Sequence, residues 1–159
     1  MQNNNINSLE QLADKVTKTH QRIYDLAGKI KAKERRISKL NEHLAQVDTY
    51  NKYIEIYKKY SKLDPKKRNA YKQNFAEEIS EYESARAYIK AHLNGRTVMP
   101  EKAWRDERKA LLEERLPLVE KYYDLKDDVK SIESLRRCAE NMMREIMPER
   151  TLRVQEMEL

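Results

Sequence analysis

A seven-residue repeat of apolar side chains runs through the first third of the chain. With Leu9 as position a of the heptad, every a position as far as Leu44 is apolar, and the d positions are apolar except at Thr19 and Lys33. The apolar members are Leu9, Leu12, Val16, Ile23, Leu26, Ile30, Ile37, Leu40, Leu44, Val47 and Ile54. This period is typical of a coiled-coil seam, in which an occasional polar residue fixes the register at a cost in stability. The repeat therefore predicts one long helix that packs lengthwise against another helix.

Composition extends this prediction to the whole chain. Of the 159 residues, 38% are charged, and there are only two glycines and four prolines. Such a composition is typical of long helices rather than of sheets. The length is that of one ordinary domain. We therefore expect an all-α fold in a single domain that spans residues 1–159.

Prolines and capping residues mark the expected helix boundaries. Ser8 has the capping-box spacing to Gln11, and Asp64 precedes Pro65 as an N-cap residue precedes a proline at the first helical position. Gly95, which follows an asparagine, is a typical left-handed helix stop. The expected helices are residues 8–63, 65–93 and 100–147, followed by a loosely held tail at residues 148–159 that begins at Pro148.

Two further apolar stripes indicate how these helices pack. A strict seven-residue spacing from Trp104 to Ile146 makes the third helix the natural partner of the first. The tyrosines from Tyr50 to Tyr60 instead lie about 100° around the first helix from its heptad seam, so the end of this helix buries a different face. The sequence thus predicts a long antiparallel coiled-coil helical hairpin with a small helical tip. An elongated three-helix bundle is the alternative.

The tip carries the best candidate contact surface, because lysines are interleaved with its tyrosines. Tyrosine rings that stack on bases beside lysines that pair with phosphates would bind single-stranded nucleic acid or a phosphate backbone. In the alternative interpretation, the tyrosines form the core of the tip and the lysines its solvated rim, neutralised by acids between Glu77 and Glu83. The candidate residues for contact with nucleic acid or a protein partner are Tyr53, Lys58, Lys59, Tyr60, Lys66, Lys67 and Arg68.

A second basic run lies between Lys29 and Lys39, midway along the first helix. Charge runs on a helix usually form a solvated face or pair with a neighbouring helix. Asp127, Glu133 and Glu140 of the third helix are the expected partners. Phosphate binding by this run is disfavoured, because its residues point in several directions around the helix.

No residues match a catalytic or metal-binding sequence pattern. His20, His43 and His92 are dispersed along the helices, and the lone Cys138 fits no metal-ligand spacing. Catalysis requires groups that converge in a cleft from which water is excluded. The sequence therefore predicts a non-enzymatic protein with no cofactor and no metal. Because no apolar run reaches the roughly 18 residues of a membrane span and the first residues lack the features of a signal peptide, we expect a cytoplasmic protein with no membrane partner.

Three segments carry a resemblance to a known family. They are residues 29–44 (KIKAKERRISKLNEHL), 49–60 (TYNKYIEIYKKY) and 97–112 (TVMPEKAWRDERKALL). From Leu9 to about Met143 the chain resembles the C-terminal helical region of relaxases, the mobilisation proteins of integrative and conjugative elements. In that family a nicking domain with a catalytic tyrosine and a histidine-bound metal precedes this region. No His-x-His pair occurs here, so the resemblance assigns no catalytic role to any tyrosine of this chain.

The resemblance implies an origin on a mobile genetic element and a role in conjugation. Our leading hypothesis is a helical interaction protein that binds transfer DNA or proteins of the transfer machinery. The alternative is an inhibitor from a mobile element or phage that resembles anti-CRISPR proteins in its role and binds a nucleic-acid-guided nuclease of host defence. A third hypothesis is a homodimer formed through the exposed side of the coiled-coil seam.

Overall fold

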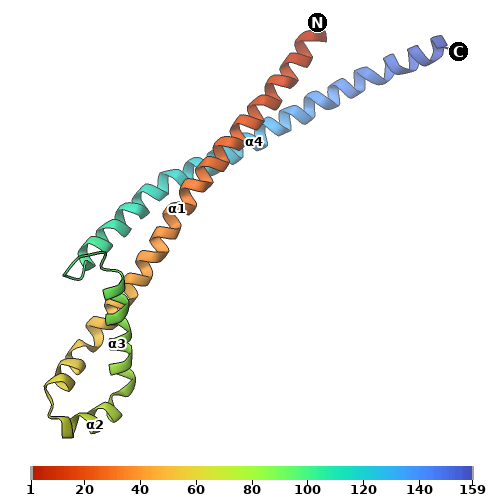
Figure 1. Cartoon of the computed structure of the whole chain (residues 1–159). Helices are drawn as coiled ribbons and strands as arrows, with labels where there is room; N and C mark the ends of the chain where they lie inside the picture. The colour runs from red at the N-terminus through yellow and green to blue at the C-terminus, as the bar shows by residue number, and fades with distance from the viewer. Residues whose placement is uncertain (1, 159) are drawn as a thin grey trace. The chain divides into compact units, whose positions relative to one another are not determined.

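The chain folds into α-helices, and no strand occurs in the described residues. The computed structural model describes the backbone of residues 2–158 and the side chains of residues 8–146. The all-α fold predicted from composition is confirmed. None of the described helices is long and apolar enough to cross a membrane. The helices are α1 (Gln2–Lys62), α2 (Pro65–Asn74), α3 (Ala76–Ala91) and α4 (Glu101–Glu158) (Figure 1).

The turns on either side of α2 and α3 use the residues that the sequence indicated. Asp64 has extended backbone angles (φ −61°, ψ 147°), and its carbonyl accepts hydrogen bonds from the N–H groups of Lys67 and Arg68 at 2.9 and 3.1 Å. Asn94 and Gly95 have positive φ angles of 50° and 83° after the end of α3. Glycine adopts such angles without steric conflict. These two predicted boundaries are therefore confirmed.

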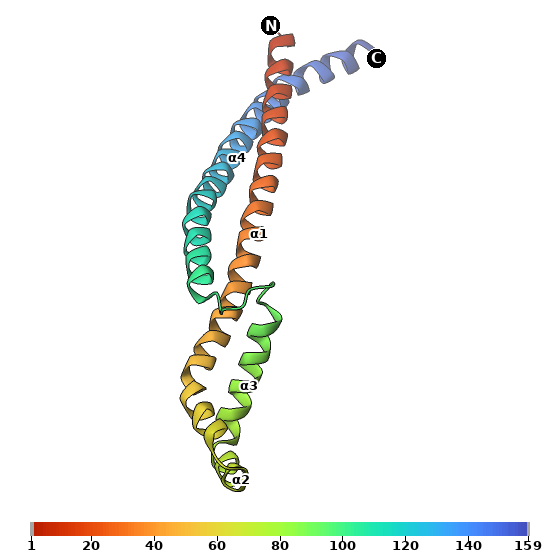
Figure 2. The ribbon, with the colours of Figure 1, turned by 60° about the vertical axis from the view of Figure 1, so that its left-hand side comes forward.

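Phe75 divides the expected second helix of residues 65–93 into α2 and α3. Its backbone angles (φ −122°, ψ 32°) are not helical, although its N–H still donates to the carbonyl of Tyr71 at 3.0 Å. The distortion changes the direction of the chain, so that α3 lies beside the last part of α1 (Figures 1 and 2). The prediction of one helix was wrong because neither proline nor glycine, the usual signals of a break, occurs at this point.

Two helix ends also differ from the prediction. The helix α1 begins before Ser8, because propagation adds one hydrogen bond per residue once a turn exists, and a capping-type residue need not interrupt it. Pro148 does not end α4, which continues to Glu158. An interior proline costs about 3 kcal/mol, but the residues that follow are mostly good helix formers. The expected tail is therefore helical as far as Glu158, and Leu159 lies outside the described residues.

Two compact units make up the chain, and each contains part of α1 and part of α4. The first unit consists of Met1–Lys31 and Leu116–Leu159, and the second is Ala32–Arg115. The boundary between the units crosses both long helices.

In the first unit, α1 and α4 run in opposite directions. Leu9 lines a hollow with Ile146, whereas Leu26 lines a different hollow with Leu125. The hydroxyl of Thr19, a polar residue of the heptad seam, donates to a backbone carbonyl of its own helix at 2.7 Å, so its polar atom is satisfied within α1. Among the side chains of this unit that the structure describes, the buried ones are Val16, Thr19, Leu26, Ile30, Val129 and Ile132.

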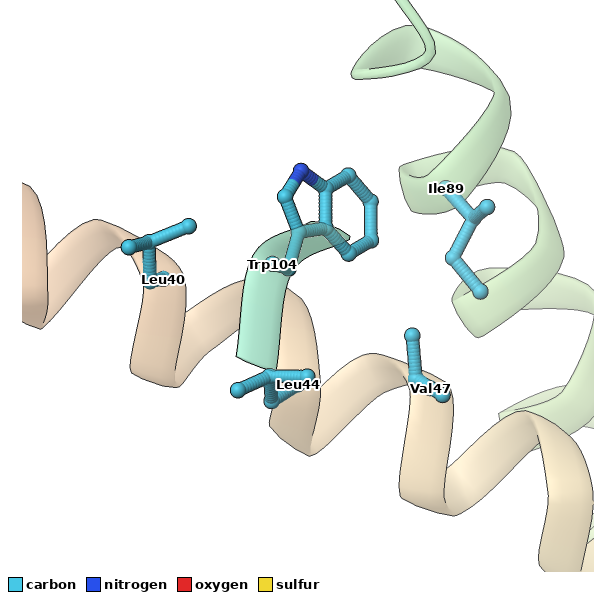
Figure 3. Close-up of a cluster of buried hydrophobic side chains, with 5 residues drawn as sticks. All are labelled: Leu40, Leu44, Val47, Ile89 and Trp104. Atoms are coloured by element: carbon cyan, nitrogen blue, oxygen red, sulfur yellow. The ribbon is translucent and has the colours of Figure 1, made fainter. Parts of the chain in front are cut away.

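In the second unit, the core forms where α1, α3 and α4 meet. Figure 3 shows Leu40, Leu44 and Val47 of α1 together with Ile89 of α3 and Trp104 of α4. Leu40 and Val47 are fully buried, and Trp104 is 5% exposed. Each fully buried side chain of this size contributes about 1.5–3 kcal/mol. The cluster therefore holds three helices together through five residues.

The basic run between Lys29 and Lys39 pairs with acids other than the expected ones. The antiparallel register places the later part of this run opposite the first turns of α4. Glu133 instead lies 3.8 Å from His20, and Glu140 pairs with Arg136 of its own helix. Such exposed pairs contribute at most about 1 kcal/mol each. The pairs that the run makes are Lys33–Glu114, Arg36–Glu107 and Lys39–Glu42.

Candidate interaction surface at the end of α1

The seven candidate contact residues lie on neighbouring turns of the second unit. Four lysines among them are exposed, whereas Tyr53, Tyr60 and Arg68 are half-buried. Figure 1 shows the end of α1 and the beginning of α2 on either side of one short turn. The end of α1 carries Tyr53, Lys58, Lys59 and Tyr60, and the first turn of α2 carries Lys66, Lys67 and Arg68.

Tyrosine rings of this region pack against one another and form an aromatic ladder between helices. Tyr82 of α3 stacks on Tyr50 and on Tyr57, with 4.9 and 4.3 Å between ring centroids. The ladder connects α1 with α2 and α3, so the ring of Tyr60 packs against other rings inside the second unit. The remaining contacts of the ladder are Tyr57–Tyr60, Tyr60–Tyr71 and Tyr71–Phe75.

The hydroxyl groups of the ladder are also constrained. Burial and the neighbouring Tyr50 hydroxyl raise the pKa of Tyr82 to about 12, so this phenol stays neutral at physiological pH. The Tyr71 hydroxyl donates to the carbonyl of Ile56 at 3.2 Å. Tyr53 lies outside the ladder, and the ammonium group of Lys52 is 5.1 Å from its ring centroid. Among the tyrosines of α1 near the tip, Tyr53 therefore has the fewest ring contacts in the described part of the chain.

Arg68 stabilises the end of α1. Its Nε donates to the carbonyl of Leu63 and its Nη2 to the carbonyl of Ser61, both at 2.9 Å. The last carbonyls of a helix have no partner within the helix, and a cation near them interacts favourably with the helix dipole. The guanidinium group thus caps α1 and joins it to α2.

Most lysines of the tip segment, which we define as residues 52–72, form no ion pair with a described side chain. This segment contains eight basic and two acidic residues, an excess that equals the formal net charge of +6 of the whole chain. Lys58 pairs with Glu55 at 3.5 Å. Within the part of the chain whose side chains are described, ion pairs are absent at Lys59, Lys62, Lys66, Lys67 and Lys72.

The acidic residues of α3 form no direct ion pairs with these lysines. Glu77, Glu78, Glu81 and Glu83 are not paired with a lysine of the tip segment among the described side chains. The tyrosines pack as the alternative interpretation predicts, whereas the acids that it names make no direct contact with the lysines.

His43 and His92 lie together, although the sequence presented them as dispersed. Their ring centroids are 4.8 Å apart, and the ring of His43 also packs on Trp104 and Tyr88 at 4.6 and 5.6 Å. Burial, and then electrostatic interaction with His92 and Arg36, lowers the pKa of His43, which is 4% exposed. His43 directly precedes Leu44 of the heptad seam, but its pairing with a residue 49 positions later has no local sequence signal.

A hollow of about 200 Å³ lies beside this histidine cluster. Its polar lining includes Arg36, Arg96, His92 and Glu107. The Arg36 guanidinium donates to Glu107 at 2.7 and 3.0 Å, which lowers the pKa of Glu107 and raises that of Arg36. Because these two charges neutralise each other, the hollow presents less uncompensated charge than the tip segment does.

Neither a search for metal-binding groups nor comparison with known proteins assigns a function to any described residue. Among the described residues, no three His, Cys, Asp or Glu side chains are grouped so that they could hold a metal ion. Comparisons of the chain with protein-family models, curated proteins and solved structures found no match. The functional proposal therefore rests on the charge and packing of the tip segment.

Proposed function

We propose that this chain is a non-enzymatic helical interaction protein, related to the C-terminal helical regions of relaxases, that contacts transfer DNA or transfer proteins in conjugative mobilisation. In this proposal the protein acts in the cytoplasm, α1 and α4 pair as an antiparallel coiled-coil hairpin, and the tip segment is the contact surface. The proposal rests on one observation, the uneven distribution of charge along the chain. Residues 52–72 contain six more basic than acidic residues, which equals the formal net charge of the whole chain.

The placement of the lysines at the start of α2 costs stability, which supports a role outside folding. Lys66 and Lys67 occupy the first turn of α2, which has no acidic residue and lies at the positive end of the helix dipole. Lys59 and Lys62 lie instead in the last turn of α1, where the dipole favours cations and offsets the repulsion between them. A partner of opposite charge would relieve the penalty at the start of α2.

The packing of the histidine cluster supports a role without catalysis. A general acid or base must come within hydrogen-bond distance of the substrate. The imidazole of His43 is covered by three rings and is 4% exposed, so a substrate would have little access to it.

A pull-down with matched charge variants tests the proposal. The tip variant combines Lys59→Glu, Lys62→Glu, Lys66→Glu and Lys67→Glu. The control variant combines Lys15→Glu, Lys18→Glu, Lys102→Glu and Lys109→Glu, four exposed lysines outside the tip segment, so both variants have the same net charge. Each tagged protein is incubated with host lysate, with and without nuclease treatment, and the captured proteins are identified by mass spectrometry.

We expect the native protein and the control variant to capture transfer proteins or transfer DNA, and the tip variant to lose them. Equal capture by the tip variant would show that the contact surface lies elsewhere. Capture of a nucleic-acid-guided defence nuclease that survives nuclease treatment would instead establish the inhibitor hypothesis.

A further inference from the structure

We infer that the tip segment binds the phosphate backbone of nucleic acid through its lysines and without stacking of bases on its tyrosines. Such a surface recognises no base sequence and binds both single and double strands. This inference rests on the proposed function and names the ligand class of the same surface.

The tyrosines of the ladder are unavailable for base stacking. A base needs an open ring face on which to lie. Tyr57 is stacked on Tyr82 at 4.3 Å and contacts Tyr60 at 5.9 Å, and Tyr60 also faces Tyr71. Opening these faces would separate α1 from α2 and α3. The binding energy therefore has to come from the residues around the ladder.

The charged residues around the ladder are mostly lysines, and an ammonium group pairs well with a phosphate group. The tip segment contains seven lysines and one arginine, and both donor contacts of Arg68 go to backbone carbonyls of its own chain. Arginine, asparagine and glutamine read base edges through paired hydrogen bonds in a fixed plane, and lysine also contacts guanine. The tip segment offers one exposed asparagine, Asn69, beside its seven lysines. A lysine ammonium group is a mobile point charge that meets a phosphate from many directions. The tip segment therefore favours contact with the backbone over readout of bases.

The same surface is poorly suited to a membrane or to a typical protein interface. Helices that lie on membranes insert an exposed apolar face, and the centres of protein interfaces are depleted in lysine. Among the described side chains, the large apolar residues that are exposed all lie outside the tip segment. They are Tyr24, Val98, Leu112, Leu116, Tyr123, Leu135, Met142 and Ile146.

The expected salt dependence follows from the number of unpaired lysines. If Lys59, Lys62, Lys66, Lys67 and Lys72 each neutralise one phosphate, the logarithm of the duplex binding constant falls with the logarithm of salt concentration with a slope of about −4.5. Affinity for duplex then decreases about 500-fold between roughly 50 and 200 mM salt, and affinity for a single strand about 100-fold.

Fluorescence anisotropy with the full-length purified protein tests this inference. The probes are labelled DNA oligonucleotides of several unrelated sequences, each single-stranded and as a duplex, at several salt concentrations. The proteins are the native chain, the tip and control variants, Tyr53→Leu, and a neutral tip variant with Gln in place of Glu at the same four positions. Circular dichroism verifies that each variant keeps its helix content.

We expect the native chain to bind all probes with the steep salt dependence given above. Both tip variants should bind more weakly, the Glu variant by at least roughly 50-fold, while the control variant stays within about threefold. Tyr53→Leu should change affinity by less than about twofold, whereas loss of a stacked base would cost roughly 10- to 100-fold.

Four results would overturn the inference: no binding of oligonucleotides, an equal loss in the control variant, a tenfold loss in Tyr53→Leu, or binding to phosphatidylserine vesicles but not to DNA. If DNA does not bind while tip-dependent capture of a transfer protein persists, this inference fails and the proposed function stands. If capture from lysate is independent of the tip, the proposed function itself fails.

Discussion

Nδ1 of His43 lies 2.9 Å from the hydroxyl of Tyr88, a hydrogen bond that joins α1 to α3. The carbonyl of Tyr88 accepts a second hydrogen bond, at 2.8 Å, from Nδ1 of His92, which must carry the proton because a carbonyl only accepts. The ring of His43 also packs on Trp104 at the beginning of α4. His43 thus connects three helices of the second unit, and its protonation state should affect their stability.

The free energy of unfolding should decrease in mild acid. Because burial lowers the pKa of His43 in the folded state, the unfolded chain binds more protons between that lowered value and the ordinary value of about 6.5. The stability contributed by neutral His43 is therefore fully present above about pH 6.5 and is lost progressively as the pH falls below it. Urea unfolding at about pH 7.5 and about pH 5.5 measures the difference.

Two substitutions assign this acid sensitivity to the buried histidine. His43→Phe keeps an aromatic ring but removes the titrating group, so its stability should depend less on pH. His20→Gln, at an exposed position in the first unit, should keep the native dependence. An unchanged dependence in His43→Phe would mean that another group titrates.

Removal of the Arg68 side chain should destabilise the second unit. Arg68→Ala leaves the carbonyls of Ser61 and Leu63 without their charged donor, and we expect a loss of about 1–2 kcal/mol. Lys67→Ala is the matched control, because this neighbour is exposed and unpaired among the described side chains, and it should change stability by less than about 0.5 kcal/mol. Urea unfolding of both variants gives the comparison, and equal effects would contradict the capping role.

Truncation of the Trp104 side chain should be among the most destabilising single substitutions in the second unit. The indole packs with Leu44 and Ile89, so Trp104→Ala creates a cavity and should lower stability by about 3–5 kcal/mol. Tyr24→Ala removes an aromatic ring that is 75% exposed and should cost less than about 0.5 kcal/mol. Thermal unfolding followed by circular dichroism compares them. A small effect at Trp104 would contradict the three-helix core.

The two glycines should respond in opposite directions to substitution by alanine. Gly28 lies within α1, and an added Cβ would meet no atom within 4 Å beyond the neighbouring residues and backbone of its own helix, so Gly28→Ala should stabilise the helix by about 0.5–1 kcal/mol. Gly95 has a φ of 83°, which an L side chain rarely adopts, and Gly95→Ala should destabilise by about 1–2 kcal/mol. Melting temperatures should therefore move up and down, respectively, and a shift in the same direction for both would contradict this difference.

The candidate surface was predictable in its position but not in the roles of its residues. The spacing of the tyrosines and lysines in the sequence predicts that they lie together at the end of α1, because helical spacing determines which side chains share a face. Whether Tyr60 meets a base or another ring depends on Tyr71, which belongs to another helix. Arg68 likewise became a capping residue only because the turn after α1 brings its guanidinium to the carbonyl of Ser61.

By itself, the sequence determined the helical fold, the heptad seam of α1 and the turns at Asp64 and Gly95. Each of these follows from interactions within a few residues, such as side-chain periodicity, capping and the backbone freedom of glycine. Only the tertiary structure decided the change of direction at Phe75 and the meeting of His43 with His92. The physical reason is that both depend on packing between helices, and such contacts join residues that no local pattern relates.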